Sequence, residues 1–339
     1  MPSGRARVVI VRGDGIGDAL ALGPLVAALR DAGHEVGALL STRNREAFAA
    51  GTFCAVHVLE RIPWPRHGST PQTYERALAE ARAQSYDVAL VASEEPEAYR
   101  FAREAHVSTR VGFTNGVEKP LKSVWARAQL TRAIVRPASA QRAVEHEAQT
   151  LFRLGRGLHG ETAPTRDAAR LRPLVVAPAA SHGRVVVQIT RKLAALGVDP
   201  AVLRDAIAAV AAEYPSVAVA DPSEAEFARE MAAACGIELE ITESVQHWKA
   251  LIAGARVLVT PDCGAAHVAG MTAVSCIDLF PATAGAAQAM RRWYPWASPR
   301  VWAIEVNRRV AAGLSMQLLA GIAYAANERV PSPSAEPAA

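Results

Sequence analysis

Short apolar runs alternate along the chain with longer segments in which apolar and polar residues recur at helical spacing. In the first half, the runs that predict strands cover residues 7–11, 34–41, 55–61, 86–93 and 110–113. A helix is predicted from the end of the first run to Arg30, and another over 73–85. Strands separated by helices predict parallel βαβ units and therefore a layered α/β fold.

The same alternation starts again in the second half of the chain. Strands are predicted over 184–189, 216–221, 256–260 and 273–280, and helices over 200–215, 223–236, 247–255 and from Ala265 onward. Between the halves, residues 154–183 are rich in Gly, Pro, Arg and Ala and lack this periodicity, so the domain boundary is placed there. We expect two Rossmann-like lobes that face a cleft, with residues 1–175 in the first lobe and 183–306 in the second.

The C-terminal segment 310–326 contains no charged residue but falls short of the roughly 20 strongly apolar residues that a membrane span needs. Leu314, Leu318, Ile322 and Ala326 recur every four residues, which places them on one face of a helix. We expect residues 307–329 to form a helix that packs back on the first lobe. The Pro- and Ser-rich tail, residues 330–339, is expected to be disordered.

Composition narrows the class of protein only slightly. Half of the residues are hydrophobic, 21% are charged, and the net charge of +4 suits phosphate-bearing substrates or an anionic membrane face. Without an RNP motif, zinc-finger spacing or a long Lys/Arg block, no nucleic-acid partner is expected. The four cysteines lack CxxC spacing, which indicates reduced thiols and no metal site. The N-terminus runs almost directly into the first strand, so we expect no signal peptide and a cytoplasmic location.

The turn after the first strand, in VIVRGDGIGDALALGPLVAAL, resembles a nucleotide loop only in part. Gly13 and Gly15 fit a dinucleotide fingerprint, but the third glycine comes one residue early, at Gly17, and Asp18 takes its place. No acid for a ribose follows the second strand, and a carboxylate at a helix N-terminus would repel pyrophosphate. A nicotinamide site is therefore disfavoured. Two interpretations of Asp18 stay open: a helix N-cap, or a functional carboxylate at the ligand-binding end of a strand.

A second loop, in VLVTPDCGAAHVAGM, joins a strand to a short helix. The first amides of that helix, from Cys263 on, could donate to an anion, and His267 lies about one turn further along. This arrangement suits a diphosphate. The alternative is that Asp262 caps the helix and His267 is a buried core residue. Cys263 is more simply a small filler than a nucleophile.

Together these two loops resemble the ADP-heptose:lipopolysaccharide heptosyltransferase family, glycosyltransferase family 9. The matching stretches are RVVIVRGDGIGDALALGPLVAAL and ALIAGARVLVTPDCGAAHVAGM followed by DLF, with weaker matches at YDVALVAS, RVGF and HEAQTLFRLG. The resemblance covers roughly residues 7–306. It implies a GT-B fold, two Rossmann-like lobes with the active site between them, and inverting sugar transfer from a nucleotide-activated donor without a metal or other cofactor.

The resemblance also implies roles for single residues. Asp18 would be the general base that deprotonates the acceptor hydroxyl, and the neighbouring Gly17 would lie on the acceptor side. The donor's ribose and diphosphate would be held by Asp262, Cys263, Gly264 and His267. Placing base and anion site on different lobes agrees with the chemistry, because a carboxylate base belongs away from the charge that develops on the departing diphosphate.

Several positions depart from the family pattern. The basic-aromatic segment that helps to hold the phosphates reads QITRKLAALGVDP here and lacks its Trp, which leaves Thr190, Arg191 and Lys192 as candidates. Cys263 replaces the usual Ser or Thr. Thr283 matches the threonine of a Gly-Pro-Thr turn that is otherwise altered. Arg110, in RVGF, is either acceptor-side or structural.

We expect ADP-heptose as the donor and a lipopolysaccharide core, another glycan or a lipid-linked glycan as the acceptor. An acceptor at the inner membrane surface would make the protein peripheral to that membrane. The alternative is a non-catalytic GT-B-fold protein that binds nucleotide or glycan. Retention of Asp18 and of the 262–267 set favours an enzyme, whereas the altered 190–192 segment favours the alternative.

Overall fold

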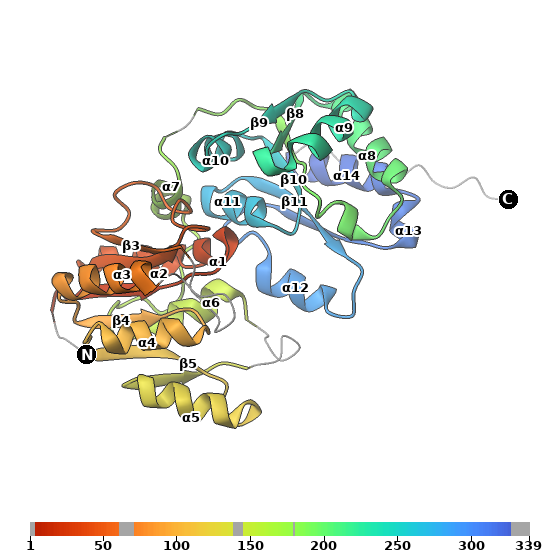
Figure 1. Ribbon diagram of the computed structural model, residues 1–339. Helices are drawn as coiled ribbons and strands as arrows, with labels where there is room; N and C mark the ends of the chain where they lie inside the picture. Colours follow the sequence, from red (N-terminus) through yellow and green to blue (C-terminus); the bar gives the residue numbers. More distant parts are fainter. Residues whose placement is uncertain (1–3, 61–70, 138–144, 179, 327–339) are drawn as a thin grey trace. The chain divides into compact units, whose positions relative to one another are not determined.

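A computed structural model describes residues 4–60, 71–137, 145–178 and 180–326, and the chain divides into two compact units (Figure 1). The first unit comprises Met1–Pro178 and Ala287–Ala297, and the second comprises Ala179–Ala286 and Ser298–Ala339. The tail predicted to be disordered, residues 330–339, lies outside the described residues.

The first unit is built on a six-stranded parallel sheet with the order β3-β2-β1-β4-β5-β6. Its strands are β1 Arg7–Val11, β2 Glu35–Ser41, β3 Val56–Leu59, β4 Val88–Val91, β5 Thr109–Thr114 and β6 Arg132–Val135. Its helices are α1 Ile16–Leu20, α2 Gly23–Asp31, α3 Pro71–Gln84, α4 Pro96–Glu104, η1 Gly116–Glu118, α5 Pro120–Gln129, α6 Glu147–Phe152, η3 Arg153–Gly155, α7 Ala168–Val175 and α12 Ala286–Trp293.

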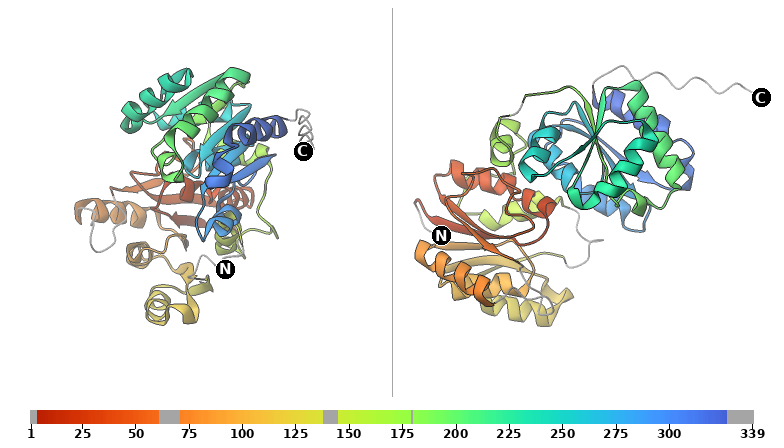
Figure 2. Two further views of the ribbon diagram at one scale, coloured as in Figure 1. Left: turned by 90° about the vertical axis from the view of Figure 1, so that its right-hand side faces the viewer. Right: turned by 45° about the horizontal axis from the view of Figure 1, so that its top comes forward.

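The second unit also holds a six-stranded parallel sheet, in the order β12-β11-β10-β7-β8-β9, with helices on both of its faces (Figure 2). Its strands are β7 Val185–Gln188, β8 Ser216–Ala220, β9 Leu239–Ile241, β10 Val257–Pro261, β11 Ser275–Pro281 and β12 Val301–Val306. Its helices are η4 Ala194–Leu196, α8 Pro200–Glu213, η5 Pro222–Glu224, α9 Ala225–Cys235, α10 Val245–Ala253, α11 Gly264–Thr272, α13 Arg308–Ala311 and α14 Leu314–Ala325.

Both sheets have the same topology, because the order 3-2-1-4-5-6 of the first unit recurs in the second when its strands are numbered from β7. In this topology the strand order reverses between β1 and β4, and again between β7 and β10. Open α/β sheets bind ligands at that reversal, beyond the carboxyl ends of the strands. The predicted α/β fold with two Rossmann-like units is confirmed, and each unit has one such position.

The C-terminal helix does not pack where the sequence analysis placed it. The expectation that residues 307–329 return to the first lobe is wrong, because α14 packs on α8 and β11 of the second unit. Its stripe of Leu314, Leu318 and Ile322 is buried in the core of that unit. The apolar stripe is buried against the sheet of its own unit, so the chain does not have to return to the first unit to bury it.

A different segment, residues 287–297, belongs to the first unit, although the predicted second lobe ran unbroken over 183–306. Its contacts explain the assignment. His146 lies 2.8 Å from the carbonyl oxygen of Tyr294 through Nε2, and the Trp296 indole donates to the carbonyl of Thr165 at 2.7 Å. The predicted irregular boundary also contains helix α7, which Asp167 caps by accepting the Ala169 N–H at 2.9 Å.

Candidate functional site

Asp18 lies at the start of α1, directly beyond the carboxyl end of β1. The N-cap of this helix is Gly15, so the interpretation of Asp18 as the N-cap residue is wrong. Asp18 is instead the third helical residue, and its Oδ2 accepts the Gly15 N–H at 3.1 Å. A Cβ at Gly15 would lie 3.2 Å from that oxygen, which explains a glycine there. The neighbouring Gly17 is helical, and its carbonyl accepts the Ala21 N–H at 3.2 Å.

The other oxygen of Asp18 is held by Arg12, the buried residue that follows β1. The distance from Arg12 Nη2 to Asp18 Oδ1 is 3.1 Å, and that from Arg12 Nε to Asp14 Oδ2 is 2.9 Å. Burial alone would lower the pKa of Arg12, but the nearby carboxylates Asp14, Glu147 and Asp18 outweigh it and raise that pKa. The Asp18 side chain keeps 36% of its surface exposed. It is therefore an oriented carboxylate that a ligand can still reach.

Asp14 shares the Arg12 guanidinium with Asp18, and it is not among the site residues predicted from the sequence. Burial raises the pKa of Asp14, the Arg12 charge opposes this shift, and the charge of Asp18 adds to it. The sequence signal was present, because RGDGIGD places two acids in one turn.

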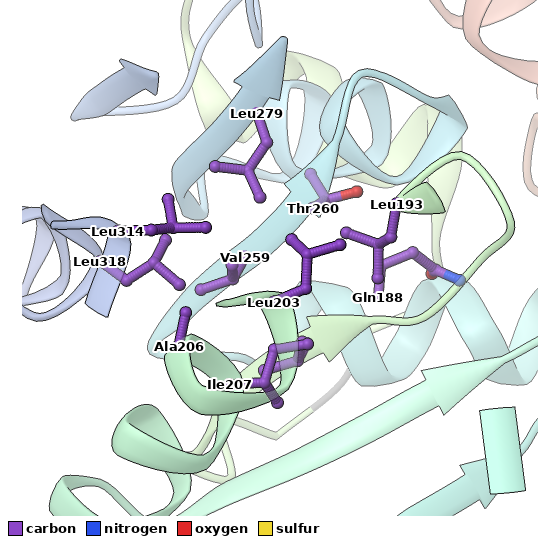
Figure 3. A pocket seen from close by; sticks show the side chains of 11 residues that line it. Gln188, Leu193, Leu203, Ala206, Ile207, Val259, Thr260, Leu279, Leu314 and Leu318 are labelled. Carbon is purple, nitrogen blue, oxygen red and sulfur yellow. The ribbon is translucent and has the colours of Figure 1, made fainter. Parts of the chain in front are cut away.

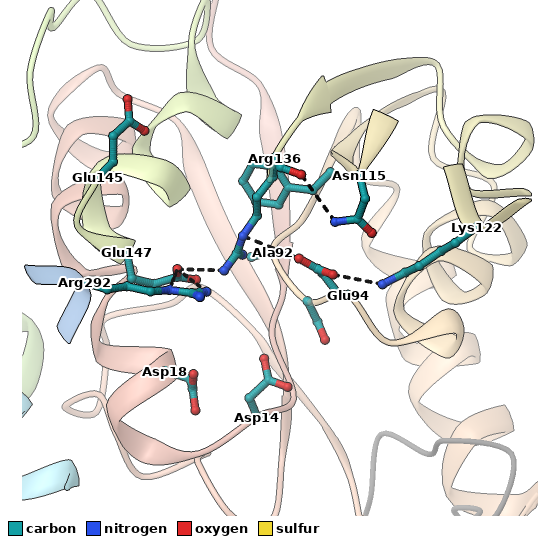
Figure 4. A network of polar contacts seen from close by, with 12 residues as sticks. Asp14, Asp18, Ala92, Glu94, Asn115, Lys122, Arg136, Glu145, Glu147 and Arg292 are labelled. Carbon is teal, nitrogen blue, oxygen red and sulfur yellow. Dashed lines mark hydrogen bonds and ion pairs between the residues drawn. The ribbon is translucent and has the colours of Figure 1, made fainter. Parts of the chain in front are cut away.

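A chain of ion pairs continues from Arg12 through Glu147, the first residue of α6 (Figure 4). The Glu147 side chain is 1% exposed and lies 3.5 Å from Arg12, 2.9 Å from Arg136 and 3.0 Å from Arg292. Arg292 comes from α12, which explains in part why residues 287–297 join the first unit. Arg12, which holds Asp18, is therefore part of a network in which carboxylates and guanidinium groups alternate.

The same chain reaches Glu94, which follows β4, at the reversal of strand order. Arg136 lies 3.5 Å from Glu94, and Lys122 of α5 lies 2.9 Å from it. Burial would raise the pKa of Glu94, but the Lys122 hydrogen bond and the charges of Arg136 and Lys122 lower it. The reversal point of the first sheet is therefore lined by fixed carboxylates and cations.

Arg110 makes the contacts of a structural residue. Its guanidinium donates to the carbonyls of Gln129 at 2.7 Å and Val107 at 2.6 Å. These carbonyls precede β6 and β5, at the amino-terminal edge of the sheet, whereas Asp18 follows the carboxyl end of β1. Of the two interpretations of Arg110, these contacts support the structural one.

In the second unit, the loops after β7 and β10 lie side by side, because these strands are neighbours in the sheet. Lys192 Nζ donates to the carbonyl oxygen of Asp262 at 2.7 Å, which brings the altered basic segment to the predicted donor loop. Thr190 Oγ1 is 3.4 Å from a carboxylate oxygen of Glu224, and Arg191 lies 3.7 Å from the same side chain. The Lys192–Asp262 contact thus brings together two loops that are 70 positions apart in the sequence.

The N-cap of α11 is Cys263, so the interpretation of Asp262 as the cap is wrong. The Cys263 sulfur lies 3.2 Å from the Thr260 hydroxyl, and burial raises the pKa of the thiol, which agrees with a small filler. Gly264 is the first residue of α11. His267, on the same helix, is buried, with 5% of its surface exposed. Thr283 lies in the exposed turn before α12.

Asp278 of β11 is a second acid that the sequence analysis missed. It has no exposed surface, and neither carboxylate oxygen has a hydrogen-bond partner among the described residues. Burial raises the pKa of Asp278 well above its ordinary value, the charge of Asp262 adds to the shift, and Lys192 opposes it. Its cross-strand neighbour is Thr260. A lone acid within the apolar run AVSCIDLF was the available signal.

A small cavity lies in the core of the second unit, lined mainly by aliphatic residues of β7, α8, β10 and α14 (Figure 3). Its volume of about 10 Å³ suits at most one water molecule. Its two polar neighbours are already bonded: Gln188 Oε1 accepts from Trp248 at 2.7 Å, and Thr260 donates to the Pro261 carbonyl at 2.9 Å. The cavity is therefore a gap in packing and not a substrate site.

Within the described ranges, no group of three or more His, Cys, Asp and Glu side chains is arranged to hold a metal ion.

No family model matches the chain, and no curated protein matches it in sequence. Solved structures do match in fold. E. coli heptosyltransferase WaaC with ADP is 17% identical, with a TM-score of 0.70 over 93% of this chain and 99% of that one. A glycosyl transferase family 9 structure from Veillonella parvula is 13% identical, with a TM-score of 0.68 over 94% and 90%. E. coli ADP-heptose lps heptosyltransferase II is 14% identical, with a TM-score of 0.64 over 92% and 98%. The predicted resemblance therefore holds at the level of the GT-B-type fold.

Proposed function

We propose that this protein is an inverting glycosyltransferase that transfers a sugar from a nucleotide-activated donor to a hydroxyl group. One observation carries the proposal. In a fold shared with heptosyltransferases, the reversal point of one sheet holds an oriented, accessible carboxylate. The reversal point of the other sheet holds a helix N-terminus beside a lysine. The first set suits a base and the second suits a diphosphate.

In the proposed reaction, Asp18 takes the proton of the acceptor hydroxyl as that oxygen attacks the anomeric carbon. The new bond joins the acceptor oxygen to this carbon, and the bond to the diphosphate oxygen breaks with its electron pair. The departing diphosphate gains charge, which the N-terminus of α11 and the Lys192 ammonium would stabilise. This supply of positive charge lets the reaction proceed without a metal.

Beneath that loop, the raised pKa of Asp278 favours its neutral form. A neutral acid adds no negative charge next to an incoming diphosphate. This explains how a buried acid is compatible with an anion site. His267, buried on α11, would hold the donor with Asp262, Cys263, Gly264 and Thr190.

We infer ADP-heptose as the donor, because E. coli WaaC has been solved with ADP and with ADP-2-deoxy-2-fluoro heptose. The inferred acceptor is a lipopolysaccharide core or another glycan, in lipid-linked form at the cytoplasmic face of the inner membrane.

Nucleotide binding and transfer test the proposal in two stages. Calorimetric titration with ADP, UDP, GDP and NAD comes first, followed by mass spectrometry of acceptor glycans incubated with ADP-heptose and, separately, with other common nucleotide sugars. We expect binding of ADP and a product heavier than the acceptor by one heptosyl residue, which is a heptose less one water. Binding of NAD but not of ADP would overturn the proposal. Binding of ADP with no transfer from any nucleotide sugar would identify a non-catalytic binding protein.

A further inference from the structure

Large apolar side chains gather on the outer side of η1 and α5. Val117, Leu121 and Val124 are 94%, 87% and 69% exposed. Leu121 and Val124 are three residues apart on α5 and therefore share one face of that helix, and Val117 lies on η1 just before it; we call these three residues the outer stripe. Of the seven exposed large apolar side chains in the described part of the chain, four lie between residues 117 and 135. Soluble proteins rarely concentrate apolar surface in this way unless something binds there.

The outer stripe is not the face by which α5 is held in the fold. On the opposite side, Ser123, Ala126 and Gln129 are buried, and α5 packs against β5 and α4. Trp125 adds an edge-to-face contact with Tyr99, at 5.8 Å between ring centroids. Because α5 already has a buried side, folding does not require the outer stripe to be apolar.

Positive charge is concentrated in the same segment. Residues 116–137 contain five Lys and Arg and one acid, Glu118, a net charge of +4. The whole chain also carries a net charge of +4, from 37 basic and 33 acidic residues. Outside residues 116–137, the 32 basic and 32 acidic residues therefore cancel, so the net charge of the chain equals that of this segment. Lys119, Arg127 and Arg132 are exposed.

The outer stripe lies at the same edge of the first sheet as the candidate base. Strand β5 runs directly into η1, and β1 runs into the loop of Asp18; both strands are parallel members of one sheet. The ion-pair chain joins the two regions, because Lys122 of α5 pairs with Glu94 at 2.9 Å (Figure 4). A ligand of the outer stripe would therefore approach the unit at its acceptor-binding edge.

We propose that the outer stripe docks on the surface of an anionic lipid bilayer. A helix that presents Leu and Val between Lys and Arg suits the boundary between acyl chains and anionic headgroups. A second copy of this chain fits less well, since a two-fold contact would oppose a segment of net charge +4 with itself. Among the described residues, no helix has both the length and the apolarity needed to cross a bilayer. Docking would deepen the proposed function by bringing Asp18 to an acceptor carried in the membrane.

Vesicle co-sedimentation with the full chain tests this docking directly. The probes are phosphatidylglycerol/phosphatidylcholine vesicles and pure phosphatidylcholine vesicles. We expect binding to the anionic vesicles that is at least about tenfold weaker in the Leu121→Ser/Val124→Ser variant, which loses the apolar part of the contact. Met316→Ser is the matched control, because Met316 is 73% exposed but lies on α14.

A second variant separates charge from apolar contact. Lys119→Gln/Arg127→Gln should bind anionic vesicles roughly 25-fold more weakly, at about fivefold per charge near the surface. The same variant should bind phosphatidylcholine vesicles as the unmodified protein does. Because all four substituted side chains are on the surface, thermal unfolding should confirm that both variants fold normally.

Three outcomes would overturn the docking proposal: no binding of the unmodified protein to anionic vesicles, equal binding by Leu121→Ser/Val124→Ser, or a dimer in light scattering that this variant converts to a monomer. None of these readouts uses sugar transfer. Failure to bind any of ADP, UDP and GDP would refute the proposed function and leave the vesicle result standing. Normal transfer to a water-soluble acceptor without vesicle binding would refute docking alone.

Discussion

Removing the buried charge of Glu147 should destabilise the first unit strongly. Its carboxylate lies 3.5 Å from Arg12, 2.9 Å from Arg136 and 3.0 Å from Arg292, with 1% of its surface exposed. Glu147→Gln keeps the shape and leaves three guanidinium groups without their common counter-charge. Breaking a buried ion pair by removing one partner costs about 3–5 kcal/mol. For a unit of this size, the unfolding temperature should fall by roughly 6–20 °C.

The neighbouring Glu145 offers a matched control. Its side chain is 48% exposed and points away from the cluster (Figure 4), and it pairs with the partly exposed Arg153 at 3.2 Å. Glu145→Gln should cost about 0–1 kcal/mol. Differential scanning calorimetry and urea unfolding would measure both variants beside the unmodified protein. If the free energies of unfolding of Glu147→Gln and Glu145→Gln differ by less than about 1 kcal/mol, Glu147 does not stabilise the first unit as a buried counter-charge.

Three further substitutions probe the two sheet-reversal points. Asp278→Val should stabilise the protein, and the gain should grow with pH. Above the ordinary pKa of an aspartate the unfolded chain releases the Asp278 proton, whereas the folded chain retains it because its pKa is raised. The free energy of unfolding of the unmodified protein should therefore fall by up to about 1.4 kcal/mol per pH unit. Urea unfolding at pH 5, 6 and 7 measures this. Gly15→Ala should lower kcat for transfer at unchanged ADP affinity, because the new Cβ would meet Asp18 Oδ2 at 3.2 Å. Lys192→Met should weaken ADP binding about tenfold, as expected for a lost charge-assisted contact to phosphate, measured by calorimetry.

Each of these expectations can fail in a distinct way. An Asp278→Val variant with the pH dependence of the unmodified protein would show that Asp278 does not hold a proton when folded. Gly15→Ala with full kcat would separate the α1 turn from catalysis. Unchanged ADP affinity in Lys192→Met, with a normal unfolding temperature, would remove Lys192 from the donor site.

Local pattern was sufficient for most of the strands, because their apolar runs are buried in the centres of two sheets. The strand over 7–11 is observed with the same bounds, and that over 256–260 is shifted by one residue. Strands β6, β9 and β12 were missed, and all three are edge strands whose residues are in part or mostly exposed. Helix α7 was hidden by Pro173, which lies within it.

The support of Asp18 could not be derived from sequence spacing. Glu147 meets Arg292 across 145 positions, and Arg12 meets the carbonyl of Ala92 across 80. Local periodicity carries no information about such partners. The crossing of residues 287–297 to the first unit was hidden for the same reason. The family resemblance pointed to Asp18 and to the 262–267 loop, and the structure shows the residues that hold them in place, Arg12 for Asp18 and Lys192 for the loop.

Replacement of Asp18 by asparagine tests the central claim most directly. Asp18→Asn keeps the side-chain shape and can still accept the Gly15 N–H, but it cannot take a proton from an acceptor hydroxyl. We expect kcat for transfer to fall about 10²–10⁴-fold, the usual contribution of a general base, with the ADP dissociation constant unchanged. Asp14→Asn, which removes a charge from the same Arg12, should keep kcat within about tenfold of the unmodified protein, because Asp14 has no proton-transfer role. Full transfer activity in Asp18→Asn would contradict the assignment of Asp18 as the base.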